Sequence, residues 1–248
     1  MEKERIGKYE FLAEPFHCDF NYRLFMGHMG NHMLNAADFH ATANGFGMDF
    51  LLPNRRAWVL SRLAIEMEEM PPMYTRFYVE TWVESVMRFF TNRNFRVVGT
   101  DGRVFGYGRA VWALLDLDTR KPTDLLLIPG INIADWVVKD KPCLMEKASR
   151  VKMSTQTELV RTIETYYSDI DINGHVNSVK YIEHVLDLWP GSWHKDHPLH
   201  RFEVAYVAEG HQGDRISFYR EQVNDLTFCV RISREDGTEL SRCQLEFA

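Results

Sequence analysis

Three polar side chains at every second position are the clearest candidates for chemistry in this chain. Asp171, Asn173 and His175 stand just ahead of a segment with apolar residues at helical spacing. In an extended segment, residues two apart point the same way, so these side chains can converge in front of a helix N-terminus. A carboxylate, an amide and an imidazole together can hold a water molecule, take its proton and stabilise a developing oxyanion. The pattern indicates a site that attacks a carbonyl group.

A purely structural interpretation of the same residues stays open at this level. Asp, Asn and Gly are also favoured in turns and at helix caps, so residues 171–175 alone could be a turn that leads into a helix. The following apolar residues fall at spacings of three and four and draw one stripe, and Pro190-Gly191 ends the pattern. The stripe consists of Val176, Val179, Ile182, Leu186 and Trp189. It predicts a helix over 176–189 with one buried face.

The elements that must position these residues recur along the chain. In the first half we predict a helix over 34–50, and then strands at 59–67, 76–84, 92–98 and 108–117. In the second half, the helix over 176–189 precedes strands at 202–208, 215–221, 227–233 and 240–247. Asp101-Gly102 and Asp236-Gly237 are expected to close the last hairpin of each half as type I′ turns. One helix followed by an antiparallel meander, twice, predicts an α+β protein.

Composition limits the classes of function. The chain has 248 residues, of which 45% are hydrophobic, and a formal net charge of -6. It can therefore bury a full core, and it lacks the concentrated basic face that nucleic-acid binding requires. No run approaches the length of a membrane span, and the N-terminus has no secretory h-region. We expect a cytoplasmic protein that binds neither nucleic acid nor membrane.

The four cysteines support the same compartment. They lie apart, without a C-x-x-C pair, at Cys18, Cys143, Cys229 and Cys243. This spacing favours free thiols in a reducing cytosol over a disulfide framework.

The segment from Ser168 to Glu183 resembles a known family signature. Its letters, S-D-I-D-I-N-G-H-V-N-S-V-K-Y-I-E, resemble the W-S-D-L-D-x-N-x-H-V-N-N-x-K-Y-I typical of acyl-acyl carrier protein thioesterases. Spaced landmarks extend the resemblance over nearly the whole chain: Trp58-Val59, Glu80-Thr-Trp-Val83, Ala110-Val-Trp112, Asp118-Thr-Arg-Lys121 and Glu203-Val-Ala-Tyr-Val-Ala-Glu209. The resemblance implies a double hot-dog fold, with two tandem antiparallel sheets each wrapped around a helix. It also implies a hydrolase that releases free fatty acid from acyl carrier protein.

The same resemblance implies that the two halves of the chain have different functions. We expect an N-terminal hot-dog domain over 1–125 that binds the acyl chain, a linker over 126–150, and a catalytic C-terminal hot-dog domain over 151–248. It implies no cofactor. No metal is expected either, because the i, i+4 pair His28 and His32 lacks the Glu of a zinc-protease motif.

Asp171, Asn173 and His175 match the family's catalytic D-x-N-x-H, and Glu209 matches its acidic residue on a later strand. Many plant members have Cys directly after that Glu, whereas this chain has Gly210, so a thiol nucleophile is absent there. Either water attacks or a carboxylate acts covalently. We expect water to attack, activated by Glu209 and His175, although the sequence leaves open which carboxylate is the base.

Two further features of the site follow from physical argument. The backbone N–H groups of Val176 and Asn177 are expected to be unpaired donors at a helix N-terminus and to bind the oxyanion. The basic linker residues Lys139, Lys141 and Lys147 could dock an acidic carrier protein, although such runs are often only solvated surface.

Alternatives remain for the carrier and for the activity. An acyl-CoA thioesterase would use the same chemistry on a different carrier. A non-catalytic acyl-binding hot-dog protein would be expected to lose the polar site residues, which are all present here. A further homodimer is compatible with a double hot-dog but not required by it.

Overall fold

The computed structural model describes residues 4–128, 132–147 and 151–248. The chain forms two compact units, the first made of residues 1–63 and 68–147 and the second of 64–67 and 148–248. Residues 129–131 and 148–150 of the predicted linker lie outside the described residues. Residues 132–147 of that linker group with the first unit.

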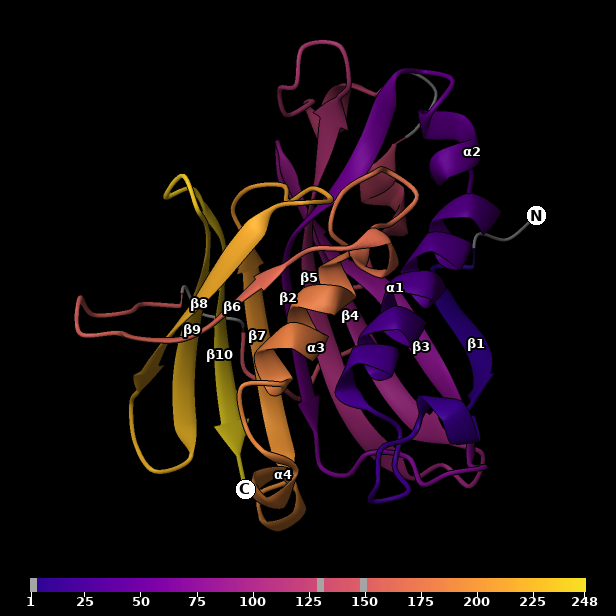
Figure 1. The fold of residues 1–248 in the computed structure, drawn as a ribbon. Coiled ribbons are helices and arrows are strands. Elements are labelled where there is room, and N and C mark those ends of the chain that lie inside the picture. Colours follow the sequence, from indigo (N-terminus) through magenta and orange to yellow (C-terminus); the bar gives the residue numbers. More distant parts are fainter. Residues whose placement is uncertain (1–3, 129–131, 148–150) are drawn as a thin grey trace. The chain divides into compact units, whose positions relative to one another are not determined.

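The first unit is an antiparallel sheet with a long helix against it (Figure 1). Its strands are β1 (Ile6–Leu12), β2 (Arg56–Met67), β3 (Arg76–Val86), β4 (Phe90–Gly99) and β5 (Val104–Asp116), in the order β1-β3-β4-β5-β2. Its helices are α1 (Met26–Ala43) and α2 (Met48–Leu51), with short 3-10 turns η1 (Pro15–His17), η2 (Leu125–Leu127) and η3 (Ile133–Trp136). Helix α1 packs against β1 and β3.

The second unit repeats this plan. Its strands are β6 (Glu158–Glu164), β7 (Leu199–Tyr206), β8 (Arg215–Gln222), β9 (Thr227–Arg234) and β10 (Glu239–Phe247), in the order β6-β8-β9-β10-β7. Its helices are α3 (Ser178–Leu186) and α4 (Gly191–Asp196), and η4 (Tyr167–Asp169) precedes α3. Because the two orders are the same, the predicted repeat and the double hot-dog class are confirmed.

The apolar stripe of the second helix is confirmed, and its bounds are corrected. All five stripe residues are buried. Helix α3 starts at Ser178 because the Asn177 side chain caps it by accepting from the Val179 N–H at 3.0 Å. The face turned to the sheet includes Tyr181, whose ring lies 6.0 Å from that of Tyr206 on β7. Helix α3 therefore brings its N-terminus and the preceding loop to the sheet.

The two Asp-Gly hairpins share one geometry, which differs from the predicted type I′ turn. Gly102 and Gly237 have φ of 87° and 86°, whereas Asp101 and Asp236 do not have positive φ. A type I′ turn needs positive φ at both central residues, so that prediction was wrong. In each hairpin the Gly N–H donates to the carbonyl three residues back, which describes a type I turn followed by a left-handed glycine.

The first helix begins eight residues earlier than predicted, at Met26 instead of residue 34. Gly27 and Gly30 weaken the helical signal, but both are buried together with Met29 and Met33, so packing overrides propensity. Strands β1 and β6 were missed altogether. Their partners are β3 and β8, so each adds an edge strand directly beside the meander of its unit.

Candidate active site

The 171–175 loop is shaped by the carboxylate of its first residue. Asp171 Oδ1 accepts hydrogen bonds from the N–H groups of Asn173 at 2.8 Å and His175 at 3.3 Å. The Asp171 N–H donates to the His175 carbonyl at 2.8 Å, and the Gly174 N–H donates to the Asp171 carbonyl at 3.0 Å. Gly174 has φ of 79°, which glycine adopts without strain. Asp171 therefore fixes the backbone that presents Asn173 and His175.

The predicted oxyanion donors are already used by the fold. The Val176 N–H donates to the carbonyl of Gly210, and the Asn177 N–H donates to the carbonyl of Asp169, both at 2.8 Å. The expectation that these two groups are unpaired was wrong, because the carbonyl groups of Asp169 and Gly210 in the same chain accept their hydrogen bonds just before the helix begins. The Val176 bond has a second consequence, since it joins the 171–175 loop to the residue that follows Glu209.

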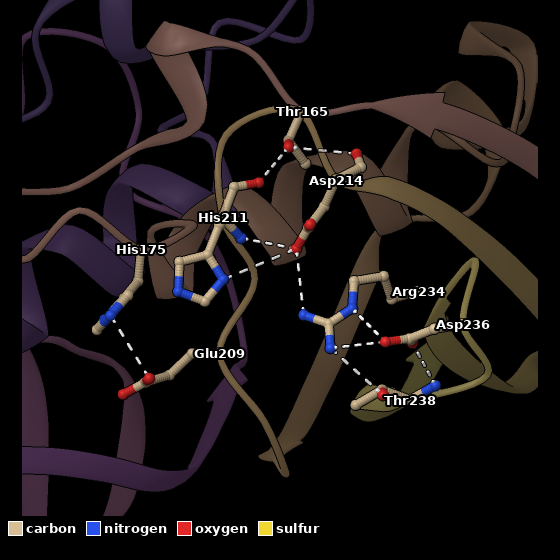
Figure 2. Close-up of polar contacts among 8 residues, drawn as sticks. All are labelled: Thr165, His175, Glu209, His211, Asp214, Arg234, Asp236 and Thr238. Atoms are coloured by element: carbon tan, nitrogen blue, oxygen red, sulfur yellow. Dashed lines mark hydrogen bonds and ion pairs between the residues drawn. The ribbon is translucent and has the colours of Figure 1, made fainter.

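A buried threonine makes the second connection between the same two segments (Figure 2). Thr165, at the end of β6, is fully buried. Its N–H donates to the Asp214 carbonyl at 3.0 Å, and its hydroxyl donates to the His211 carbonyl at 2.5 Å. The Gly213 N–H donates back to the Thr165 carbonyl at 2.9 Å. The segment 209–214 is thus held against the start of the segment that carries His175.

His175 and Glu209 are brought together by these connections. His175 Nε2 lies 3.5 Å from Glu209 Oε2, and the two side chains are 29% and 36% exposed. This separation is longer than a good hydrogen bond, and a water molecule beside both groups would be in reach of each. The Asn173 side chain is exposed, and its Nδ2 lies 3.5 Å from Asp171 Oδ2. Its amide hydrogens are therefore weakly engaged.

Gly210 is required by close packing. A Cβ at this position would lie 2.6 Å from the Tyr181 hydroxyl oxygen and 3.0 Å from Val176 Cγ2. Ordinary carbon contacts begin near 3.5 Å, so any larger residue forces a neighbour to move. The absence of a thiol here is consistent with the way the two segments meet.

No other thiol of the second unit is suited to act as nucleophile. Cys229 and Cys243 are both free and buried. Burial raises the pKa of the Cys229 thiol to about 11 and raises that of Cys243 further. A thiol is reactive as its thiolate, so both side chains are inert at neutral pH.

His211 completes the site and was missed by the sequence analysis. Its ring lies 5.2 Å from the His175 ring, perpendicular to it. The backbone N–H of His211 donates to Asp214 Oδ2 at 2.8 Å, and the ring nitrogen Nδ1 lies 3.9 Å from the same oxygen (Figure 2). The only signal in the sequence is the position of His211 two residues after Glu209, and in a loop outside any strand that spacing does not distinguish it.

The first unit holds a copy of the 171–175 loop. Asp19 Oδ1 accepts from the N–H groups of Asn21 at 2.8 Å and Arg23 at 3.3 Å, and the Asp19 N–H donates to the Arg23 carbonyl at 2.8 Å. In the place of the histidine, however, stands Arg23, which is paired with Glu69 at 2.5 Å. Arginine stays protonated and cannot serve as a base. Of the two loops, only the second carries an imidazole.

The three lysines predicted to dock a carrier protein differ in environment. Lys139 and Lys147 are exposed. Lys141 donates to Glu80 Oε2 at 2.6 Å, and its ammonium lies 5.0 Å from the centre of the Trp82 ring. Lys141 is therefore already paired within the first unit, and docking by the three lysines stays a prediction.

A cavity of about 470 Å³ in the second unit does not include His175, Glu209 or His211 in its lining. Its lining is polar and includes Thr162, Arg215, Arg231 and Glu239 from the sheet. Such a lining does not suit an acyl chain, which needs an apolar channel.

Two family models match the chain. The model described as the acyl-ACP thioesterase N-terminal domain matches residues 7–126, and the one described as the C-terminal domain matches residues 152–248. Among solved structures, an acyl-ACP thioesterase from Bacteroides thetaiotaomicron is 48% identical with a TM-score of 0.93, and the match covers 100% of both chains.

Other relatives are more distant, and one of them is a solved structure with the same fold. The 12:0-ACP thioesterase from Umbellularia californica is 19% identical with a TM-score of 0.82, over 98% of this chain and 97% of that one. A palmitoyl-acyl carrier protein thioesterase of Gossypium hirsutum chloroplasts is 25% identical over 72% of this chain. The match spans 46% of the Gossypium protein, so the chain covers about half of that relative's length.

Proposed function

Because the chain belongs to the acyl-ACP thioesterase family, we propose that it hydrolyses fatty acyl-acyl carrier protein to free fatty acid and carrier protein. The observation that carries the proposal is the pairing of His175 with Glu209 at 3.5 Å in a partly buried site. A carboxylate and an imidazole at this separation can both contact one water molecule that lies beside them, and together they can activate it. The reaction class is hydrolysis of a thioester.

In the proposed mechanism, water attacks the thioester carbonyl carbon. Glu209 takes a proton from the water molecule that His175 orients, and the water oxygen adds to the thioester carbonyl. The tetrahedral intermediate then collapses and breaks the C–S bond. The thiolate of the carrier's prosthetic group leaves and receives the proton held by Glu209. No thiol nucleophile is needed, in keeping with Gly210 and the buried cysteines of this unit.

The other polar residues have separate roles in this scheme. Asn173 is the oxyanion donor, since its amide is exposed and only weakly engaged by Asp171. Asp171 is a positioning residue, because its carboxylate bonds the backbone N–H groups of Asn173 and His175. We therefore propose Glu209 as the general base; the sequence alone left the choice between Glu209 and Asp171 open.

The first unit is proposed to bind the acyl chain. Its helix α1 buries Met26, Met29 and Met33, and unbranched thioether side chains adapt to ligands of differing shape. Lys139 and Lys147 are proposed to meet the acidic surface of the carrier protein. A homodimer stays a prediction.

A cytoplasmic location is also part of the proposal. All four cysteines are thiols outside any disulfide, which suits a reducing compartment. Across the described ranges, no helix has both the length and the apolar character needed to cross a membrane.

The test is hydrolysis of a ladder of acyl-carrier-protein thioesters, with the same acyl groups on coenzyme A, followed by mass spectrometry of the products. Glu209→Gln removes the base at constant size, so kcat should fall by about 10²- to 10⁴-fold with a modest change in KM. Glu235→Gln, at an exposed carboxylate of the same unit, is the matched control. Faster turnover of the coenzyme A series would mean that coenzyme A, not acyl carrier protein, is the preferred carrier. Full turnover by Glu209→Gln would show that Glu209 is not the base.

A further inference from the structure

His175, Glu209 and His211 each bring one ligand atom to a common point. The three atoms, two imidazole nitrogens and one carboxylate oxygen, all lie within 4.8 Å of one another. In the part of the chain that the structure describes, this is the one such group of three. We propose that these residues form a zinc-binding site and that bound Zn²⁺ blocks hydrolysis; the blocking rests on the proposed function.

The ligand set matches zinc in type and number. Two imidazoles and one carboxylate, with a fourth position left for water, are a recurring zinc environment, with bonds of about 2.0 to 2.2 Å. Such bonds place neighbouring ligand atoms roughly 3.4 Å apart in a tetrahedron. His175 Nε2 and Glu209 Oε2 are already separated by 3.5 Å. Only His211 has to approach, and its side chain is 51% exposed.

The surroundings of His211 orient it for this role. Its Nδ1 faces Asp214 Oδ2 at 3.9 Å, so Nε2 is the nitrogen left for the metal (Figure 2). A carboxylate behind the second nitrogen of a histidine is the usual support of a zinc ligand. Asp214 is itself held by the His211 N–H at 2.8 Å and lies 3.6 Å from Arg234. The orienting carboxylate is therefore fixed in place.

Zinc bound here would prevent His175 and Glu209 from activating water. The metal would take the His175 nitrogen and the Glu209 oxygen that the proposed mechanism needs for the attacking water. Magnesium should not substitute, because it prefers oxygen ligands in octahedral geometry. We therefore expect reversible inhibition by Zn²⁺ that a chelator relieves, and none by Mg²⁺.

The experiment measures binding and activity separately on the full chain, freed of any histidine tag. Zn²⁺ binding is followed by competition with a chromophoric chelator, and hydrolysis is followed at the same Zn²⁺ concentrations. Wild type should bind one equivalent and lose activity in parallel. His211→Ala should weaken both effects by about tenfold or more. His197→Ala, at a histidine stacked on Trp193 in the same unit, should bind zinc like wild type.

The outcomes separate the two proposals. If wild type takes up no zinc, or if His211→Ala binds it as tightly, the site is rejected. If zinc binds and turnover is unchanged or rises, the blocking is rejected. Should no thioester be hydrolysed at all, the proposed function fails, while the binding measurement still decides the zinc site. Each activity is expressed relative to the same variant without zinc, so a change in basal turnover does not affect the comparison.

Discussion

Gly210→Ala should crowd the contact that holds the two catalytic segments together. The new Cβ would lie 2.6 Å from the Tyr181 hydroxyl oxygen and 3.0 Å from Val176 Cγ2. Tyr181 is 3% exposed and Val176 is 6% exposed, so neither can swing into solvent. Overpacking of this kind costs about 1 to 3 kcal/mol. For a chain of this length, that corresponds to a fall in Tm of roughly 2 to 12 °C.

The same substitution should reduce turnover. Glu209 directly precedes Gly210, and the Gly210 carbonyl accepts the Val176 N–H at 2.8 Å. Any shift that relieves the clash therefore moves Glu209 relative to His175. A displacement of about 1 Å at a catalytic group can cost about 10²-fold in rate. We expect kcat to fall while KM changes little.

Tyr181→Phe supplies the control. It removes the oxygen that makes the shortest contact, so Gly210→Ala should cost less in this background than in wild type. Thermal unfolding of the two single variants and the double variant gives the coupling between the positions. The reasoning is refuted if Gly210→Ala unfolds within about 1 °C of wild type. It is also refuted if Tyr181→Phe leaves the loss undiminished.

Three further outcomes can be measured. Asp171→Asn keeps an oxygen acceptor for the loop N–H groups and should retain far more activity than Asp171→Ala, whereas equal abolition would mark Asp171 as the base. Lys139→Glu with Lys147→Glu should raise KM for the carrier-bound substrate and spare a small thioester, and equal losses on both would contradict docking. Burial lowers the pKa of His40 to about 4, and the side chain is 1% exposed. The unfolded chain therefore binds the extra proton below pH 6.5, so stability should fall by up to about 3 kcal/mol as pH drops from 6.5 to 4. Urea unfolding of wild type and His40→Gln across this pH range measures the loss. If the free energy of unfolding depends on pH in the same way in both proteins, His40 does not cause it.

Local pattern predicted much of this architecture because it reports burial. The stripe from Val176 to Trp189 and the meander strands after each helix were predicted from periodicity, and each corresponds to a buried face in the fold. The start of α1 was not predictable, since Gly27 and Gly30 lower helix propensity and only packing against β1 and β3 restores it. Tertiary contacts decided that boundary.

The site shows the same limit in its hydrogen bonds. Spacing predicted that His175 would be presented by an extended loop, and the resemblance supplied Glu209. Spacing could not tell that the Val176 N–H is consumed by the Gly210 carbonyl, because that acceptor is 34 residues away in the chain. The pairing of Lys141 was not predictable for a similar reason, since its partner Glu80 lies on β3. His211 was missed because one histidine in a loop has no distinctive pattern.

The copy of the catalytic loop in the first unit provides an internal calibration for mutagenesis. Asp19 makes the same backbone hydrogen bonds as Asp171, at the same distances, but the residue four positions on is Arg23 instead of a histidine. Asp19→Ala therefore reports what the loss of those bonds does to a loop of this shape without an imidazole. The excess effect of Asp171→Ala on turnover, beyond that reference, belongs to the chemistry that the second loop alone supports.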